Sequence, residues 1–382
     1  MKLRKNYLLS PGPTPVPEAV SLAGALPMIH HRTPQFQAVM KDCFDGLKIL
    51  FQTENPVLFF ASSGTGMMEA AIANLMSPGE EMIVAEAGKF GERWSEIGNV
   101  YGCKVIPIKI EYSRTVKPDV IAQTLSQHPN AKAVFIQLSE TSTGCVHDVE
   151  AIAKVVNKTK TLLVVDGISG LGAEPCTPDA WGIDCILTGS QKGVMLPPGL
   201  GFISLSEKAW KRVDESKCPR YYFDLKKAKK SATTHDSPFT PAISLLFQLQ
   251  EALKIIKDET MEGVWKRHTW MAQATRAGCQ ALNLELFAER PGNVLTAVKT
   301  PAGVDGEKLV KVMRDDLGVT IAGGQDQMKG QLFRIAHLGY MDRFDILTAI
   351  AALETALKRQ GFNIKPGQGV AAAQEILWKD PT

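Results

Sequence analysis

The chain has 382 residues, more than a single hydrophobic core usually organises, so its length predicts two domains. Apolar residues make up 45% and charged residues 22% of the sequence, which is ordinary for a soluble globular protein. The net charge of +3 comes from nearly balanced signs and gives no indication of a nucleic-acid partner. The seven cysteines include no C-x-x-C pair, which argues against a disulfide framework, a zinc site or an iron–sulfur cluster.

No apolar run approaches the roughly 18 residues that a membrane helix needs, so we expect no membrane span. The first 17 residues turn to prolines too early for a signal peptide, and the last four match no peroxisomal or endoplasmic-reticulum address. We therefore expect a cytoplasmic protein with reduced thiols. The basic cluster at residues 226–230 is interpreted as a solvated face rather than a binding patch.

Residues 9–15, Leu-Ser-Pro-Gly-Pro-Thr-Pro, are the first distinctive segment. Proline fixes φ and disfavours helix in the residue before it, so this segment predicts a rigid, extended arm. His30, His31 and Arg32 follow, just before a helix that we expect over residues 35–51. From the residues alone, these three side chains are surface positions where that helix starts.

The segment 59–66 predicts a strand followed by a glycine-bearing loop, and residues 67–76 predict a helix. Free amide groups at the start of a helix favour an anion, and small residues let a phosphate approach the backbone closely. Ser63, Gly64 and Thr65 are therefore the candidate phosphate-binding residues, although a lone Gly-Thr-Gly is weak evidence.

Two further strands are predicted over residues 81–85 and 133–138, and a polar loop follows each of them. Phe90 follows the first strand, and Thr141 lies in the hydroxyl-rich loop 139–144 after the second. Taken alone, a phenylalanine is most often a core residue, and such a loop is often a simple turn.

The most informative stretch places an acid and a lysine after neighbouring strands. Residues 162–165 form an apolar, β-branched run that ends in Asp166, at the carboxyl end of a strand, where open α/β sheets bind ligands. A second buried strand, 183–187, leads into Gly-Ser-Gln191-Lys192. Burial disfavours the ammonium form, so a lysine in this position is suited to lose its proton and attack a carbonyl.

The remaining third of the chain predicts helices and then a smaller α/β unit. Helical patterns cover residues 241–258 and 261–281, and strand and helix signals then alternate over 295–298, 305–317 and 333–336. Arg334 lies within the last strand. Its planar guanidinium is suited to bind a carboxylate through two hydrogen bonds, although an arginine on an edge strand can also be a plain surface charge.

Taken together, Asp166, the Ser-Gln-Lys at residues 190–192 and the Pro-Pro-Gly-Leu-Gly turn at 197–201 resemble the motif of class V pyridoxal 5′-phosphate (PLP) aminotransferases. The resemblance covers about residues 8–360 and is closest to the alanine–glyoxylate and serine–pyruvate branch. It implies the α/β, PLP-dependent transferase fold of type I, with a mostly parallel central sheet, helices on both faces and a smaller C-terminal α/β domain. The implied division is 1–260 for the arm and large domain and 261–382 for the small domain.

The resemblance also implies a role for each candidate residue and a homodimer without bound metal. Lys192 and Asp166 are the expected catalytic residues, and Arg334 and Gly12 are the expected substrate-binding residues. Thr240, in Ser-Pro-Phe-Thr-Pro at residues 237–241, is expected to reach the phosphate of the partner subunit. The full set expected to bind the cofactor is Ser63, Gly64, Thr65, Phe90, Thr141, Asp166, Gln191, Lys192 and Thr240. By similarity to phosphoserine aminotransferases, His31 and Arg32 are alternatively expected at the mouth of the site.

The function implied by the resemblance is transfer of an amino group from alanine or serine to glyoxylate or pyruvate. Phosphoserine transamination and cysteine desulfuration remain alternatives within PLP chemistry. A desulfurase needs a reactive cysteine on a mobile loop near Arg334, and the nearest cysteine in the sequence is Cys279. Some similar proteins carry the name of a soluble-hydrogenase small subunit, so a non-redox hydrogenase accessory protein is the alternative from another class.

Overall fold

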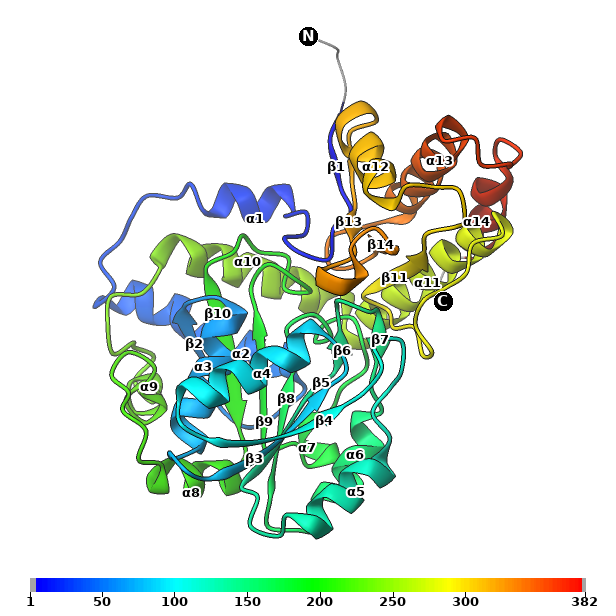
Figure 1. The fold of residues 1–382 in the computed structure, drawn as a ribbon. Coiled ribbons are helices and arrows are strands. Elements are labelled where there is room, and N and C mark those ends of the chain that lie inside the picture. The colour runs from blue at the N-terminus through cyan, green and yellow to red at the C-terminus, as the bar shows by residue number, and fades with distance from the viewer. Residues whose placement is uncertain (1–4, 380–382) are drawn as a thin grey trace.

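The computed structural model describes residues 5–379, which contain a central seven-stranded sheet (Figure 1). Only β10 runs antiparallel to its neighbours β2 and β9, so the predicted, mostly parallel sheet is confirmed. In spatial order the strands are β2 (Val57–Ala61), β10 (Leu200–Leu205), β9 (Cys185–Gly189), β8 (Leu162–Asp166), β5 (Ala133–Gln137), β3 (Glu81–Glu86) and β4 (Lys104–Lys109).

Helices cover both faces of this sheet because the strands are apolar on both sides. On β5, Val134 and Ile136 belong to one buried cluster, whereas Phe135 between them belongs to the other, as the period of two in a strand requires. The first cluster takes in α2 (Pro34–Phe51), α5 (Pro118–Gln127), α6 (Val149–Val156) and α10 (Ile243–Glu259), with α1 (Glu18–Ala23) and α7 (Pro178–Trp181) beside them. The second takes in α3 (Gly64–Leu75), α4 (Lys89–Val100), α8 (Glu207–Glu215) and α9 (Leu225–Ala232).

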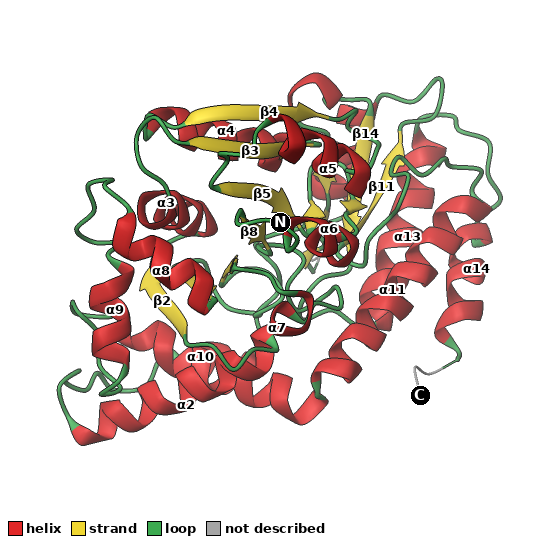
Figure 2. Ribbon diagram, turned by 90° about the horizontal axis from the view of Figure 1, so that it is seen from below, coloured by secondary structure: helices red, strands yellow, loops and turns green. Residues whose placement is uncertain are grey.

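The C-terminal part of the chain builds a smaller, three-stranded antiparallel sheet in the order β11 (Leu295–Lys299), β14 (Leu332–Ala336) and β13 (Ala322–Gly323). Figure 2 shows three of its helices, α11 (Met261–Ala281), α13 (Arg343–Arg359) and α14 (Gln368–Leu377), side by side. The shorter elements of this part are α12 (Gly306–Lys311), a π-helical turn (Val312–Asp316) and a 3₁₀ turn (Asp326–Met328). The hairpin strands β6 (Ser139–Glu140) and β7 (Cys145–Val146) belong to the preceding part of the chain and follow β5.

The N-terminal arm joins the two parts of the molecule. Strand β1 (Tyr7–Leu8) pairs with β12 (Val319–Thr320), and Leu9 lies in the C-terminal apolar cluster rather than in the clusters of the large sheet. The chain passes from one core to the other within α11, where Val264 belongs to the first cluster and Met271 to the C-terminal one. The division at residue 260 stays a prediction.

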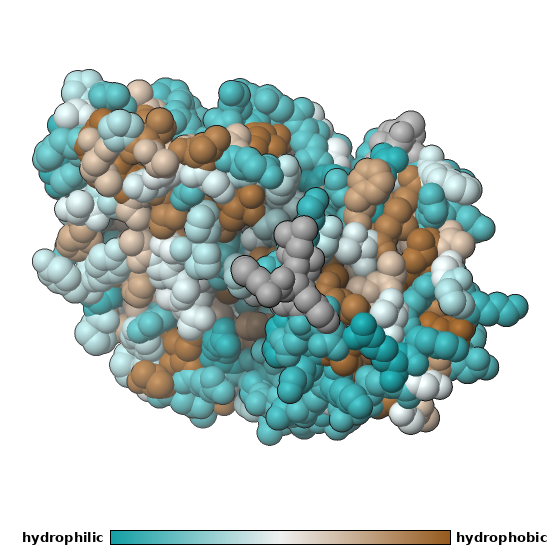
Figure 3. Space-filling view, turned by 90° about the horizontal axis from the view of Figure 1, so that it is seen from above, coloured by the Kyte–Doolittle hydropathy of each residue, from teal (hydrophilic) through white to brown (hydrophobic). Residues whose placement is uncertain are grey.

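The surface carries polar and apolar groups side by side, as Figure 3 shows for the face seen from above. Among large apolar side chains, Leu22, Leu26 and Met28 are exposed by 71%, 54% and 66%. Within residues 5–379, no helix is long and apolar enough to cross a bilayer.

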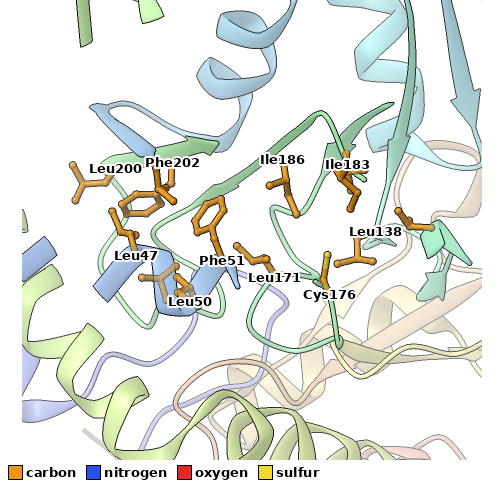
Figure 4. Packing of buried hydrophobic residues seen from close by; sticks show 14 of the residues in the cluster. Leu47, Leu50, Phe51, Leu138, Leu171, Cys176, Ile183, Ile186, Leu200 and Phe202 are labelled. Carbon is orange, nitrogen blue, oxygen red and sulfur yellow. The ribbon is translucent and has the colours of Figure 1, made fainter. Parts of the chain in front are cut away.

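The packing behind the sheet is shown in Figure 4, where Leu47, Leu50 and Phe51 of α2 lie against Leu200 and Phe202 of β10. Phe51 is fully buried, and burying a side chain of this kind contributes about 1.5–3 kcal/mol to folding. This packing fixes the strands whose carboxyl ends carry the site.

Candidate active site

Lys192 lies three residues beyond the end of β9, beside the N-terminal arm. Its amine donates a hydrogen bond to the carbonyl oxygen of Pro11, and a Cβ on Gly12 would lie only 2.3 Å from its Nζ. Gly12 also has φ +132°, so only glycine fits here. Burial lowers the pKa of Lys192 to about 8; Asp166 opposes this shift, and the charges of Arg334 and Arg93 add to it.

Asp166 ends β8, the strand next to β9, and only 4% of it is exposed. Its carboxylate accepts one hydrogen bond, from the Ile168 amide at 2.7 Å. Burial raises the pKa of Asp166 to about 7, against the effects of that hydrogen bond and of Arg93 and Lys192. Gln137 of β5, its partner in register, is also buried, and both polar atoms of its amide lack a partner among the described residues. This edge of the sheet therefore keeps unfilled hydrogen-bonding capacity.

The predicted phosphate-binding residues form the start of α3. Ser63 is the N-cap, and its hydroxyl accepts a hydrogen bond from Gly66 N at 3.3 Å. A Cβ on Gly189 would lie 3.1 Å from Oε1 of Gln191 and 3.3 Å from the amide nitrogen of Gly64. The Gln191 side chain and the start of α3 therefore both approach the backbone of Gly189. Oε1 of Gln191 is buried without a hydrogen-bond partner among the described residues. The helix starts at Gly64, three residues earlier than the sequence predicts, which brings Thr65 into its first turn.

A buried acid that we did not single out from the sequence holds the loop after β5. The carboxylate of Glu140 accepts hydrogen bonds from the amides of Phe90 (3.1 Å), Gly91 (3.0 Å) and Ser142 (3.0 Å), and from the Ser142 hydroxyl. It therefore fixes the start of α4, with Phe90, against the loop that carries Thr141. An acid just after a buried strand was the available signal, the same one that identified Asp166.

Arg334 comes from β14 of the small sheet and reaches the same loop. Its Nη1 donates to the carbonyl oxygen of Thr141 at 2.8 Å, while Nε and Nη2 donate to Gly323 O at 3.0 and 2.6 Å. Arg334 is 4% exposed, and burial lowers its pKa to about 10, against the effect of Glu140. The Thr141 hydroxyl donates to Ser169 at 2.7 Å, another residue that the sequence analysis missed.

Several candidate residues lie apart from Lys192, Asp166 and Arg334 in the single chain. Thr240 is exposed and lines a small cavity with Ala61 and Tyr222. The rings of His30 and His31 stack at 4.8 Å, and Arg32 forms an ion pair with Asp236 at 2.8 Å on the surface.

Cys279 is fully buried within α11, and burial raises its pKa to about 12. It is neither on a loop nor ionised near neutral pH, as a desulfurase nucleophile needs to be. Within residues 5–379, no cluster of His, Cys, Asp or Glu side chains is arranged to hold a metal ion.

Comparison with known proteins identifies the family of this chain. The sequence matches the family described as Aminotransferase class-V over residues 6–345. A relative from Synechococcus sp. (strain PCC 6716) named soluble hydrogenase, small subunit, is 43% identical over 379 residues, 98% of each chain. The serine–glyoxylate aminotransferase of Methylorubrum extorquens is 35% identical over 390 residues, which cover 99% of this chain and 97% of the relative.

A solved structure of alanine–glyoxylate aminotransferase from Nostoc sp. has 28% identity and a TM-score of 0.89, covering 94% of this chain and 96% of that one. Together with the family match and the relatives, it confirms the predicted fold of the PLP-dependent aminotransferases. The chain belongs to the class V aminotransferases, which are PLP-dependent transaminases.

Proposed function

We propose that this chain transfers an amino group from a small amino acid, alanine or serine, to a 2-oxo acid, glyoxylate or pyruvate. The observation that carries the proposal is that the Lys192 amine and the Asp166 carboxylate follow adjacent strands and lie close enough for each charge to shift the pKa of the other group. The substrate classes come from the names of the serine–glyoxylate and alanine–glyoxylate relatives.

The side chains fit PLP. Asp166 is a buried carboxylate with one hydrogen bond, and a pyridinium N–H would give it the cationic donor that keeps it ionised. Oε1 of Gln191, buried without a partner, lies beside the free amides that start α3, where a phosphate ester binds favourably. Ser63, Gly64, Thr65 and Gln191 would hold the phosphate, and Phe90 and Thr141 would contact the ring and its phenolic oxygen.

When bound, PLP supplies an electron sink for the carbanion that forms when the amino donor loses its Cα proton. Lys192 would hold the cofactor through its amine and then act as the base. With a pKa of about 8, a fraction of its Nζ is uncharged near neutral pH, so it can take up the Cα proton and return it. Arg334 has N–H groups beyond those on Gly323 and Thr141, and these would bind the α-carboxylate and orient the donor.

The enzyme is proposed to be a cytoplasmic homodimer. Three exposed apolar side chains, Leu22, Leu26 and Met28, precede the half-buried His31 and the exposed Arg32, and would be covered by a second copy. In such a dimer, Thr240 would reach the phosphate of the partner site.

The first test is the covalent attachment of the cofactor. The purified protein is expected to be yellow, and Lys192→Ala is expected to abolish the absorbance band of lysine-bound PLP. Lys104→Ala, which removes an exposed lysine paired with Glu81, is the matched control and should keep the band. Survival of the band in Lys192→Ala would refute the assignment.

A panel of amino donors against glyoxylate, pyruvate and 2-oxoglutarate then identifies the substrates. Preference for a phosphorylated donor would favour phosphoserine transamination over our proposal. Co-purification with a hydrogenase, together with no PLP absorbance, would favour the accessory role that the name of the Synechococcus relative suggests.

A further inference from the structure

Arg93 of α4 contacts two of the residues proposed to bind the cofactor. Its Nη1 donates a hydrogen bond to Oγ1 of Thr65 at 3.2 Å, across the gap between the starts of α4 and α3. Its guanidinium carbon lies 4.8 Å from the centroid of the Phe90 ring, within the range of a cation–π contact. Arg93 therefore links the residue expected to stack on the cofactor to the first turn of the phosphate-binding helix.

The charge of Arg93 is not neutralised by a carboxylate. Seven other arginines of residues 5–379 form ion pairs with acids within 4.0 Å, namely Arg32, Arg114, Arg212, Arg267, Arg290, Arg314 and Arg359. Arg220, Arg276 and Arg334 instead donate to backbone carbonyl oxygens. Within the same described range, Arg93 has no acid as a partner. The neighbouring acid Glu92 is already bound to Lys89 and Tyr112.

A guanidinium without a carboxylate partner beside the start of a helix creates a favourable position for an anion. The free N–H groups of α3 carry partial positive charge, and Arg93 adds a full charge next to them. A guanidinium has five N–H donors, so the bond to Thr65 leaves others to bind an oxyanion. The same positive charge lowers the pKa values of Asp166 and Lys192, which places it within electrostatic range of both.

We propose that Arg93 binds the phosphate of the cofactor together with the first turn of α3, while its guanidinium holds the Phe90 ring in place. The inference rests on the proposed function, because it assumes that PLP is the ligand. A phosphate ester offers three oxygens to the N–H groups of Arg93 and of α3, and it neutralises the positive charge of both. The remaining face of the Phe90 ring is then free to stack on the pyridine.

The experiment compares PLP with pyridoxal, which has the same ring and aldehyde but no phosphate. Affinities are measured by quenching of tryptophan fluorescence in the cofactor-depleted full-length protein, without reference to activity. Arg93→Gln keeps a donor for Thr65 and removes the charge. Arg114→Gln is the matched control, since Arg114 is 59% exposed and pairs with Glu289 on the surface.

We expect Arg93→Gln to weaken the affinity for PLP about 10- to 100-fold, the range for a hydrogen bond to a charged group. The affinity for pyridoxal, which loses only the support of the Phe90 ring, should fall by much less. Arg93→Lys, which keeps a point charge without the planar fork, should lose less, and Arg114→Gln should match the wild type for both ligands. If Arg93→Gln does not fold, the same comparison is made with Arg93→Lys, for which a selective loss of PLP affinity supports the proposal and equal losses overturn it.

Other results would overturn the inference. An equal loss of affinity for PLP and pyridoxal would mean that Arg93 only supports the Phe90 ring. Unchanged affinity for both ligands would mean that Arg93 does not contact the phosphate. Unchanged PLP affinity with a raised KM for the donor assigns Arg93 to a substrate carboxylate. Failure of the wild-type protein to bind PLP at all would instead contradict the proposed function.

Discussion

Two buried acids at the carboxyl edge of the large sheet differ in how their hydrogen-bonding capacity is filled. Glu140, in the short strand β6 that follows β5, accepts bonds from three backbone amides and a hydroxyl. Asp166, at the end of the adjacent strand β8, accepts one. A buried carboxylate that the protein satisfies holds the structure together, whereas one left largely unsatisfied is available to a ligand. The difference separates Glu140, which supports the structure, from Asp166, the acid that we propose to be catalytic.

The largest effect is expected from Asp166→Asn, which keeps the shape of the side chain and removes its charge. Without the anion that keeps the pyridine nitrogen protonated, kcat should fall about 10²- to 10³-fold, as when other preorganised electrostatic groups are removed. Steady-state kinetics with the best donor checks this, and circular dichroism confirms an intact fold. A near-normal kcat would mean that Asp166 is not the functional acid.

Glu140→Gln is expected to lower the stability of the protein more than its activity. The amide group weakens charge-assisted hydrogen bonds to Phe90 and Gly91, so the free energy of unfolding should fall by about 1–3 kcal/mol, as measured by denaturant titration. The loss in kcat should be smaller than for Asp166→Asn. The opposite ranking, with Glu140→Gln folded normally and nearly inactive, would reverse the assignment of the two acids.

The third prediction concerns the pH dependence of stability. Burial raises the pKa of Asp166 from its ordinary value of 3.8 to about 7, so the folded, cofactor-free protein favours the protonated form. The stability that this group contributes is present below pH 3.8 and is lost as pH rises through 7, with a slope of at most about 1.4 kcal/mol per pH unit.

Glu174 is buried too, and its pKa is also raised to about 7, so the wild type alone cannot isolate Asp166. Subtracting the free energy of unfolding of Asp166→Asn from that of the wild type at each pH removes the contribution of Glu174, which both proteins share. Denaturant titrations from pH 4 to 8 should show a flatter pH dependence in Asp166→Asn, and parallel curves would contradict the raised pKa.

The sequence predicted the sheet and the positions of Asp166 and Lys192 after its strands, because both depend on local patterns. The apolar runs before Asp166 and Lys192 identify buried strands, and parallel strands bring their carboxyl ends to one edge. Arg334 was predicted as a carboxylate-binding residue from the chemistry of its guanidinium and from the family resemblance. Its contact with the Thr141 carbonyl, which joins residues 193 positions apart, was not predicted.

What the sequence could not give depends on distant contacts. Arg93 stands in a polar helix among other charged residues, and nothing in its neighbours indicates that its charge stays unneutralised. The role proposed for Thr240 needs a second subunit, so neither the sequence nor the single chain tests it. The start of α3 was placed three residues too late because its glycines favour a loop, whereas here they line the turn at which Gly64 approaches Gly189.

The N-terminal arm has a mechanical consequence for the enzyme. Leu9 is hydrogen-bonded to Ala336, two residues beyond Arg334, and Pro11 is hydrogen-bonded to the amine of Lys192. A tilt of the small sheet toward an arriving substrate would therefore pull on a tether that ends at the Lys192 amine. Binding of the donor carboxylate would then be coupled mechanically to the nitrogen that we propose removes the donor's proton.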